Sequence, residues 1–133
     1  MNDLRVGDEI SCRFGFGKLF RHVGICADFH PITGEPLIAH NSRDFGGVRV
    51  SSIREFSDGN AVSVRSQKSP RRPALIQQMI FRLIGKPYDP VNYNCEHFVS
   101  EVLGYHPHSP QAAFWIGTGL IGGAALLAVA SRR

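Results

Sequence analysis

Alternating apolar and polar side chains in the first half of the chain predict a series of short β-strands. The segment 8–14 (DEISCRF) places Ile10, Cys12 and Phe14 on one face and is followed by the turn-prone sequence GFGK. Four further β-like runs lie at 22–27, 37–40, 48–50 and 61–64. The segments between them carry Gly, Asp, Asn and Ser, so we expect about five strands connected as a meander, with a hairpin turn at 30–36.

The pattern changes to a helical period after residue 70. Apolar side chains recur three and four positions apart between 72 and 84 and form a single stripe, which Gly85 and Pro87 end. A second helix is predicted to begin after Asn94, a good N-cap residue, and to end at Gly104. Strands followed by helices are typical of an α+β domain, here a small antiparallel sheet packed on helices.

The segment 112–130 (AAFWIGTGLIGGAALLAVA) holds 19 residues without a charge. As a helix it would be about 28 Å long, close to the thickness of a bilayer core. Trp115 near one end and two arginines after the other end suit the two membrane interfaces. The segment predicts a C-terminal hydrophobic helix that anchors the protein in a membrane; the alternative is a buried hydrophobic hairpin, or a tail that is disordered outside lipid.

These patterns divide the chain into a domain at 1–105, a linker at 106–111, the apolar segment 112–130 and a basic end at 131–133. Gly119 and Gly123 form a GxxxG pair, which would permit self-association of two tails. Glycines 117, 119 and 122 also match GxGxxG, but no strand and no later acidic residue surround them as dinucleotide binding requires. The sequence therefore predicts no cofactor.

The net charge of +4 is modest, but the cations are unevenly placed. Between Gly59 and Tyr88 there is no acidic residue, and the basic ones are Arg65, Lys68, Arg71, Arg72, Arg82 and Lys86. This stretch fits either an anionic lipid surface or a solvated helix face with a basic loop. A nucleic-acid partner is not expected, because no aromatic-basic interleaving or reader motif is present.

No apolar stretch opens the chain, so we expect no secretory signal at its start. An odd number of cysteines, three, in no paired spacing points to a reducing compartment. Cys12 and Cys26 fall in strand segments and are expected to be small buried hydrophobes. Because CxxC and HxxxH pairs are missing, and Cys95-x-His97 alone is a weak signal, no metal site is predicted either.

Cys95 is the candidate nucleophile, because it falls in the first turn of the second predicted helix. A helix N-terminus stabilises a thiolate, and its free N–H groups can hold the oxyanion of a tetrahedral intermediate. Glu96 is expected to point outward. His97 lies about 200° around the helix from Cys95 and should face away from it.

The base must then come from another part of the fold. His22 and His40 are predicted at the ends of two strands, where they could present a base and its orienting imidazole to Cys95. The alternative is that both are polar residues of edge strands. His30, His106 and His108 lie in turns or the linker and are expected to be solvated.

The segment 94–99 (NCEHFV) resembles the signature of the lecithin:retinol acyltransferase-like family, which includes the small phospholipase A/acyltransferases. Further similar segments, together spanning about residues 5–104, are GDEI at 7–10, HVGI at 22–25, IAH at 38–40 and GKPY at 85–88. The resemblance implies a circularly permuted NlpC-type, papain-like fold. It also implies that Cys95 is the nucleophile, His22 the general base and His40 a second imidazole that orients or polarises the first.

Members of this family move an acyl chain from a phospholipid ester onto the cysteine, and then to water, an amine or another lipid. The resemblance thus predicts a membrane-anchored acyltransferase or phospholipase A with its catalytic domain on the cytoplasmic side. Its partners would be a phospholipid or other acyl substrate and the membrane. Two alternatives remain: an amidase or peptidase of the NlpC type, and a non-enzymatic, membrane-tethered interaction module.

Overall fold

Five antiparallel strands form one sheet in the computed structural model, which describes residues 3–65 and 69–104. The strands are β1 (Glu9–Phe14), β2 (Phe20–Phe29), β3 (Pro36–Ser42), β4 (Gly47–Ser52) and β5 (Val62–Arg65). Their order across the sheet is β4-β3-β2-β1-β5. The predicted meander is therefore right for the first four strands and wrong for the fifth, which returns to the free edge of β1. Alternation along a strand sets its buried face but does not select its neighbour.

Three α-helices complete the domain, so the predicted α+β class with a small antiparallel sheet is confirmed. They are α1 (Ile53–Ser57), α2 (Pro73–Leu83) and α3 (Cys95–Leu103), and a 3-10 turn, η1 (Phe16–Lys18), lies between β1 and β2. Helices α2 and α3 match the predicted segments. Helix α1 was not predicted, because five residues are too few to show a helical period.

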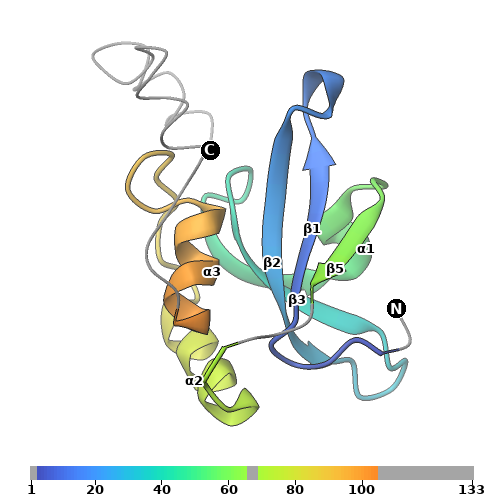
Figure 1. Ribbon diagram of the computed structural model, residues 1–133, viewed down its shortest axis with the longest axis vertical. Helices are drawn as coiled ribbons and strands as arrows, with labels where there is room; N and C mark the ends of the chain where they lie inside the picture. The colour runs from blue at the N-terminus through green and yellow to red at the C-terminus, as the bar shows by residue number, and fades with distance from the viewer. Residues whose placement is uncertain (1–2, 66–68, 105–133) are drawn as a thin grey trace.

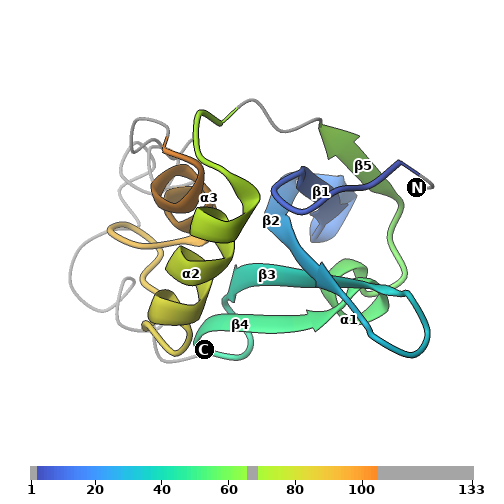
Figure 2. The same cartoon turned by 90° about the horizontal axis from the view of Figure 1, so that it is seen from below.

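The sheet has a core on each face. Helices α2 and α3 lie beside one another against β2 and β3, whereas α1 contacts β3 and β4 from the opposite side (Figures 1 and 2). The larger core contains Val23 and Ile25 of β2 with Ile76 of α2 and Phe98 of α3. The smaller core joins Ile10, Cys26 and Ile38 of the sheet to Phe56 of α1. The sheet is thus covered by α2 and α3 on one face and by the short helix α1 on the other.

Helix α3 has a capped start and a glycine end. The side chain of Asn94 accepts hydrogen bonds from the backbone N–H groups of Glu96 and His97, and Gly104 closes the helix with φ 83°. An N-cap of this kind stabilises a helix by about 1 kcal/mol. It fixes Cys95 as the first residue of the helix, where the sequence predicted it.

Some cations of the predicted basic stretch serve the domain itself. The guanidinium of Arg71 donates to the carbonyls of Glu101 and Val102 at the end of α3, at 2.6 and 3.0 Å. Positive charge there complements the helix dipole. Lys86 lies 3.7 Å from the Glu101 carboxylate and over the ring of Tyr93. Arg65 lies 3.8 Å from the Glu9 carboxylate. Three of the six cations are thus engaged with protein groups, which leaves fewer for a lipid surface.

The linker 106–111, the apolar segment 112–130 and the basic end 131–133 all lie outside the described residues. The predicted membrane-anchoring helix and the GxxxG pair lie there too. Between residues 3 and 104, apart from 66–68, no helix combines the length and the apolar character needed to cross a bilayer.

Candidate functional site

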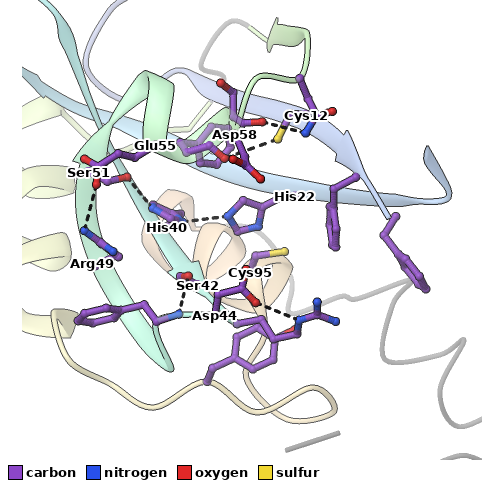
Figure 3. Close-up of a pocket in the computed structure, with 18 of the residues that line it drawn as sticks. Cys12, His22, His40, Ser42, Asp44, Arg49, Ser51, Glu55, Asp58 and Cys95 are labelled. Atoms are coloured by element: carbon purple, nitrogen blue, oxygen red, sulfur yellow. Dashed lines mark hydrogen bonds and ion pairs between the residues drawn. The ribbon is translucent and has the colours of Figure 1, made fainter. Parts of the chain in front are cut away.

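A cavity of about 630 Å³ lies where the strands, α1 and the start of α3 meet. Three of the side chains that the sequence singled out line it together: His22, His40 and Cys95 (Figure 3). Five aromatic residues line it as well: Phe14, Phe20, Phe45, Phe56 and Tyr88. Most of the other lining residues are polar or charged, among them Asp44, Glu55 and Asp58. We call this space the His–Cys cavity.

The two histidines lie deeper in the sheet than predicted. His22 is the third residue of β2 and His40 the fifth of β3, so neither lies at a strand end. The strands are longer than their apolar runs, because β2 begins at Phe20 and β3 continues to Ser42. His40 is buried and His22 is half-buried. Interior positions fix the rings more firmly than strand ends would.

A chain of hydrogen bonds joins three side chains of neighbouring strands. His22 Nε2 lies 2.9 Å from His40 Nδ1, and His40 Nε2 lies 2.8 Å from the hydroxyl of Ser51 in β4. Because Nε2 of His22 is engaged in this chain, Nδ1 is the remaining ring nitrogen of His22. A His22 with its proton on Nε2 donates to His40, which in turn donates to Ser51, and its Nδ1 then carries a free lone pair. That tautomer is the one a base needs.

Ser51 was not foreseen as a member of the site. It is buried, with 5% of its surface exposed, in a segment that reads as an ordinary strand. Arg49 pairs with His40 across β3 and β4, and Ser51 lies two residues after Arg49 in β4. A polar residue near a histidine on the adjacent strand can be found only once the register is known.

Phe56 of α1 packs against both imidazoles. Its ring stacks on His22 with 4.9 Å between centroids and meets His40 edge-on at 5.2 Å. Gly24 makes room for it, since a Cβ there would lie 2.9 Å from Phe56 Cε2 and 2.8 Å from Ile38 Cγ2. The absence of a side chain two residues after His22 therefore lets α1 approach the sheet and support the pair.

The start of α3 reaches the same cavity from the other side. Cys95 is 2% exposed, and its sulfur lies 4.0 Å from the backbone carbonyl of Arg21, the residue before His22. Asn41, the neighbour of His40, donates to the carbonyl of Tyr93 at 2.8 Å. Both histidine strands thus contact the segment that carries Cys95. His97 points elsewhere, as predicted: its Nδ1 accepts from the backbone N–H of Asn94.

The cap engages two N–H groups at the start of α3. The N–H groups of Glu96 and His97 both donate to Asn94 Oδ1, at 2.9 and 3.2 Å. The prediction that the first turn holds an oxyanion therefore does not extend to these two groups. Tyr88 and Arg43 are among the cavity-lining residues and carry donor groups, and Arg43 also lies 3.8 Å from the Asp44 carboxylate. Glu96 is half-buried and is not one of the cavity-lining residues.

Both imidazoles are neutral at physiological pH. Burial lowers the pKa of His22 to about 4, an effect that Asp44 opposes and Arg43 reinforces. Burial, followed by the neighbouring charges of His22 and Arg49, lowers the pKa of His40 to about 3. A neutral imidazole has a lone pair that can accept a proton, and the resting histidine is not a preformed imidazolium. The lowered pKa also makes His22 a weaker base than an ordinary imidazole.

The other two cysteines behave as buried hydrophobes. Cys12 is 4% exposed and Cys26 fully buried. Burial raises the pKa of Cys12, and it raises that of Cys26 to about 11. Neither thiol is readily ionised, although Cys12 borders the His–Cys cavity. In the described part of the chain no three His, Cys, Asp or Glu side chains gather as ligands for a metal.

No protein-family model matches the chain, and no curated protein matches it. The similarity to the lecithin:retinol acyltransferase-like family therefore stays a prediction from the quoted segments.

Proposed function

We propose that this chain is a membrane-associated thiol acyltransferase or phospholipase A-type hydrolase that acts on phospholipid acyl esters through a thioester on Cys95. The observation that carries the proposal is the His–Cys cavity: a thiol at a helix start and two hydrogen-bonded neutral imidazoles line one space together with five aromatic residues. Thiol nucleophiles need such an adjacent base, itself oriented by a third group. A volume in the range of about 300–1,000 Å³ is usual for small-molecule sites.

In the proposed reaction, Nδ1 of His22 takes the proton of the Cys95 thiol as the sulfur attacks the ester carbonyl. The resulting tetrahedral oxyanion meets donors on the cavity wall, with Tyr88 and Arg43 as candidates. Collapse breaks the ester C–O bond, and His22 returns the proton to the departing lysophospholipid hydroxyl. Water, an amine or a second lipid then attacks the thioester, again with His22 as base, and the Cys95 thiol is restored.

His40 is proposed as a positioning residue. Its bond to Ser51 orients the ring, and its bond to His22 favours the tautomer with the proton on Nε2. The order of these residues along the chain, two histidine strands and then the cysteine helix, supports the circularly permuted NlpC-type architecture. We also propose that 112–130 anchors the protein in a membrane, with the domain on the cytoplasmic side.

Acyl-adduct mass spectrometry tests the reaction. After incubation with phosphatidylcholine, the peptide that contains Cys95 should gain the mass of one acyl chain, and Cys95→Ala should gain nothing and release no lysophospholipid. Cys26→Ala is the matched control, since it removes a buried thiol outside the cavity. Lysophospholipid release that persists in Cys95→Ala contradicts the mechanism. Cleavage of γ-glutamyl or cell-wall peptides without lipid turnover would identify an amidase instead.

Truncation tests the anchor. A chain that ends at residue 110 should leave the membrane fraction on a high-salt wash, whereas the full chain should remain in it. Alkylation of Cys95 should proceed equally in both forms. If the truncated chain resists the wash as the full chain does, 112–130 is not the anchor.

A further inference from the structure

The tip of the β1–β2 hairpin exposes apolar side chains to solvent. Phe16 is fully exposed and Leu19 is 62% exposed. Three backbone positions in this short turn have positive φ: Gly15 at 81°, Gly17 at 67° and Lys18 at 56°. Glycine adopts such angles easily and lysine does so rarely. The backbone thus reverses within a few residues and gives Phe16 no protein surface on which to pack.

Positive charge surrounds this tip. From Ile10 to Ala27 the sequence contains three cations, Arg13, Lys18 and Arg21, and no acidic residue. A groove of about 570 Å³ runs along the flank of the hairpin, where these cations are joined by Arg65 and a single acid, Glu9. Glu9 already contacts Arg21 at 3.0 Å and Arg65 at 3.8 Å.

The remaining two cations of the groove are not neutralised in this way. Lys18 donates to the amide oxygen of Asn60, which is uncharged. Within the described ranges, neither Arg13 nor Lys18 pairs with a carboxylate. The hairpin therefore combines an apolar tip with a cationic flank, which is the pattern of segments that bind anionic lipid interfaces.

The hairpin also forms part of the His–Cys cavity. Phe14 and Phe20, at the two strand ends below the tip, line the cavity, and their rings lie 5.8 Å apart. The ring of Phe14 is 6.2 Å from that of His22. In Figure 1 the β1–β2 turn projects beyond the rest of the sheet. A partner surface that binds the hairpin tip would therefore lie next to one wall of the His–Cys cavity.

We propose that the β1–β2 hairpin tip docks on an anionic phospholipid bilayer, with Phe16 and Leu19 entering the interface and Arg13 and Lys18 meeting lipid phosphates. The purpose of this docking would be to deliver a lipid ester to the His–Cys cavity, and that purpose rests on the proposed function. The binding of the hairpin tip to the bilayer does not itself depend on catalysis. Two apolar side chains and a few cations give reversible binding, and this contact would orient a domain that a separate segment tethers.

A tryptophan placed at the tip tests the docking in the full chain. Trp115 is the one tryptophan of the sequence, so Trp115→Phe provides a silent background. In that background, Phe16→Trp should show blue-shifted emission and quenching by brominated acyl chains on vesicles of phosphatidylcholine and phosphatidylserine at about 7:3. Inorganic phosphate alone should change neither signal, which separates a lipid surface from a free anion.

Ile32→Trp in the same background is the matched control. Ile32 is 88% exposed, in the turn at the opposite end of β2, a strand of ten residues. Its emission should stay that of a solvated indole on the same vesicles. An unshifted Phe16→Trp overturns the proposal, and so does an equal shift at both positions, because the tip would then have no special contact. A response to phosphate alone also overturns it.

Activity measurements separate this inference from the proposed reaction. Phe16→Ser should lower turnover of vesicle lipid at least about tenfold, since it removes a large apolar side chain from the interface. Turnover of a soluble short-chain ester should be unchanged, because Phe16 does not line the cavity. Equal loss on both substrates contradicts docking. If the wild type turns over neither substrate, the proposed function fails, and the tryptophan measurement still decides the docking.

Discussion

Nε2 of His22 lies 2.9 Å from Nδ1 of His40, and the far nitrogen of His40 lies 2.8 Å from the Ser51 hydroxyl. The two rings are nearly perpendicular, at 79°, and both contact Phe56. Hydrogen bonds and stacking together restrict both imidazoles to one arrangement. His22 and Cys95 line the same cavity, and Ser51 is the far end of the hydrogen-bond chain, so the role of the chain can be tested at Ser51.

Removal of the Ser51 hydroxyl should slow the reaction of Cys95. Ser51→Ala takes away the partner of His40 Nε2, and a hydrogen bond of this kind is worth about 1 kcal/mol. Alkylation of Cys95 by iodoacetamide should therefore slow roughly five- to tenfold, with a changed pH profile. Ser51→Thr, which keeps the hydroxyl, should recover much of the rate.

Ser100→Ala is the control for this measurement, because Ser100 is also a poorly exposed serine but lies outside the cavity. Its alkylation rate should equal that of the wild type. A wild-type rate and pH profile in Ser51→Ala would show that the His40–Ser51 contact has no role in orienting the base.

Acid should destabilise the fold through the same pair. The folded pKa values, about 4 for His22 and about 3 for His40, lie below the ordinary value of 6.5. As the pH falls below 6.5, both histidines therefore bind protons in the unfolded chain while they stay neutral in the folded chain. The free energy of unfolding should decrease by up to about 1.4 kcal/mol per pH unit for each imidazole.

Urea unfolding between pH 7 and pH 5 measures this slope. His40→Asn should lower the slope, because one of the two imidazoles with a lowered pKa is gone. His30→Asn should leave it unchanged, since His30 is exposed in a turn. Equal slopes in wild type and His40→Asn would mean that the pair does not resist protonation.

The elements that carry local signals were predictable. Asn94 as a cap, Gly104 as an end and a stripe of apolar residues between them define α3 from sequence alone, because these interactions span a few residues only. The edge position of β5 and the short helix α1 could not be predicted from the sequence, because both depend on contacts made after the chain has folded back. Ser51 belongs with them: its place beside His40 follows from the β3–β4 register.

Two predictions for the first turn of α3 compete in part. Asn94 was correctly predicted as an N-cap, and the N–H groups of the same turn were also assigned to an oxyanion. The capping side chain engages two of those N–H groups, so these two do not serve both purposes. The conflict was already visible in the sequence. The pairing of His22 with His40, in contrast, was expected for strand ends and occurs inside the strands.

His97 and His22 should separate folding from reactivity. His97 Nδ1 accepts from the backbone N–H of Asn94, so His97→Ala removes half of a capping box and should cost about 1 kcal/mol of stability. The alkylation rate of Cys95 should change little. His22→Ala should lower that rate about a hundredfold or more, because general-base assistance is typically worth that much.

Both variants are compared under conditions in which more than nine-tenths of each is folded, as followed by circular dichroism. A His22→Ala rate near that of the wild type contradicts its assignment as the base. A large loss of rate in folded His97→Ala would instead move the base to α3.

Gly24→Ala should disturb the two imidazoles through packing alone, because the added methyl group contacts none of their hydrogen-bonding atoms. The added Cβ would lie 2.8 Å from Ile38 Cγ2 and 2.9 Å from both Phe56 Cε2 and the Ala39 carbonyl. The backbone of β3 cannot yield easily, so Phe56 must move away from His22. Overpacking of this kind costs about 1–3 kcal/mol, and the loosened stack should slow Cys95 alkylation several-fold as well.

Gly34→Ala is the matched control, since a Cβ there meets nothing within 4 Å. Its positive φ of 73° makes alanine unfavourable by about 1 kcal/mol, so it also loses stability, but far from the site. The two variants should thus share a lower free energy of unfolding and differ in reactivity. If Gly24→Ala loses stability and still reacts at the wild-type rate, Phe56 supports the fold alone and the imidazoles are held by their hydrogen bonds.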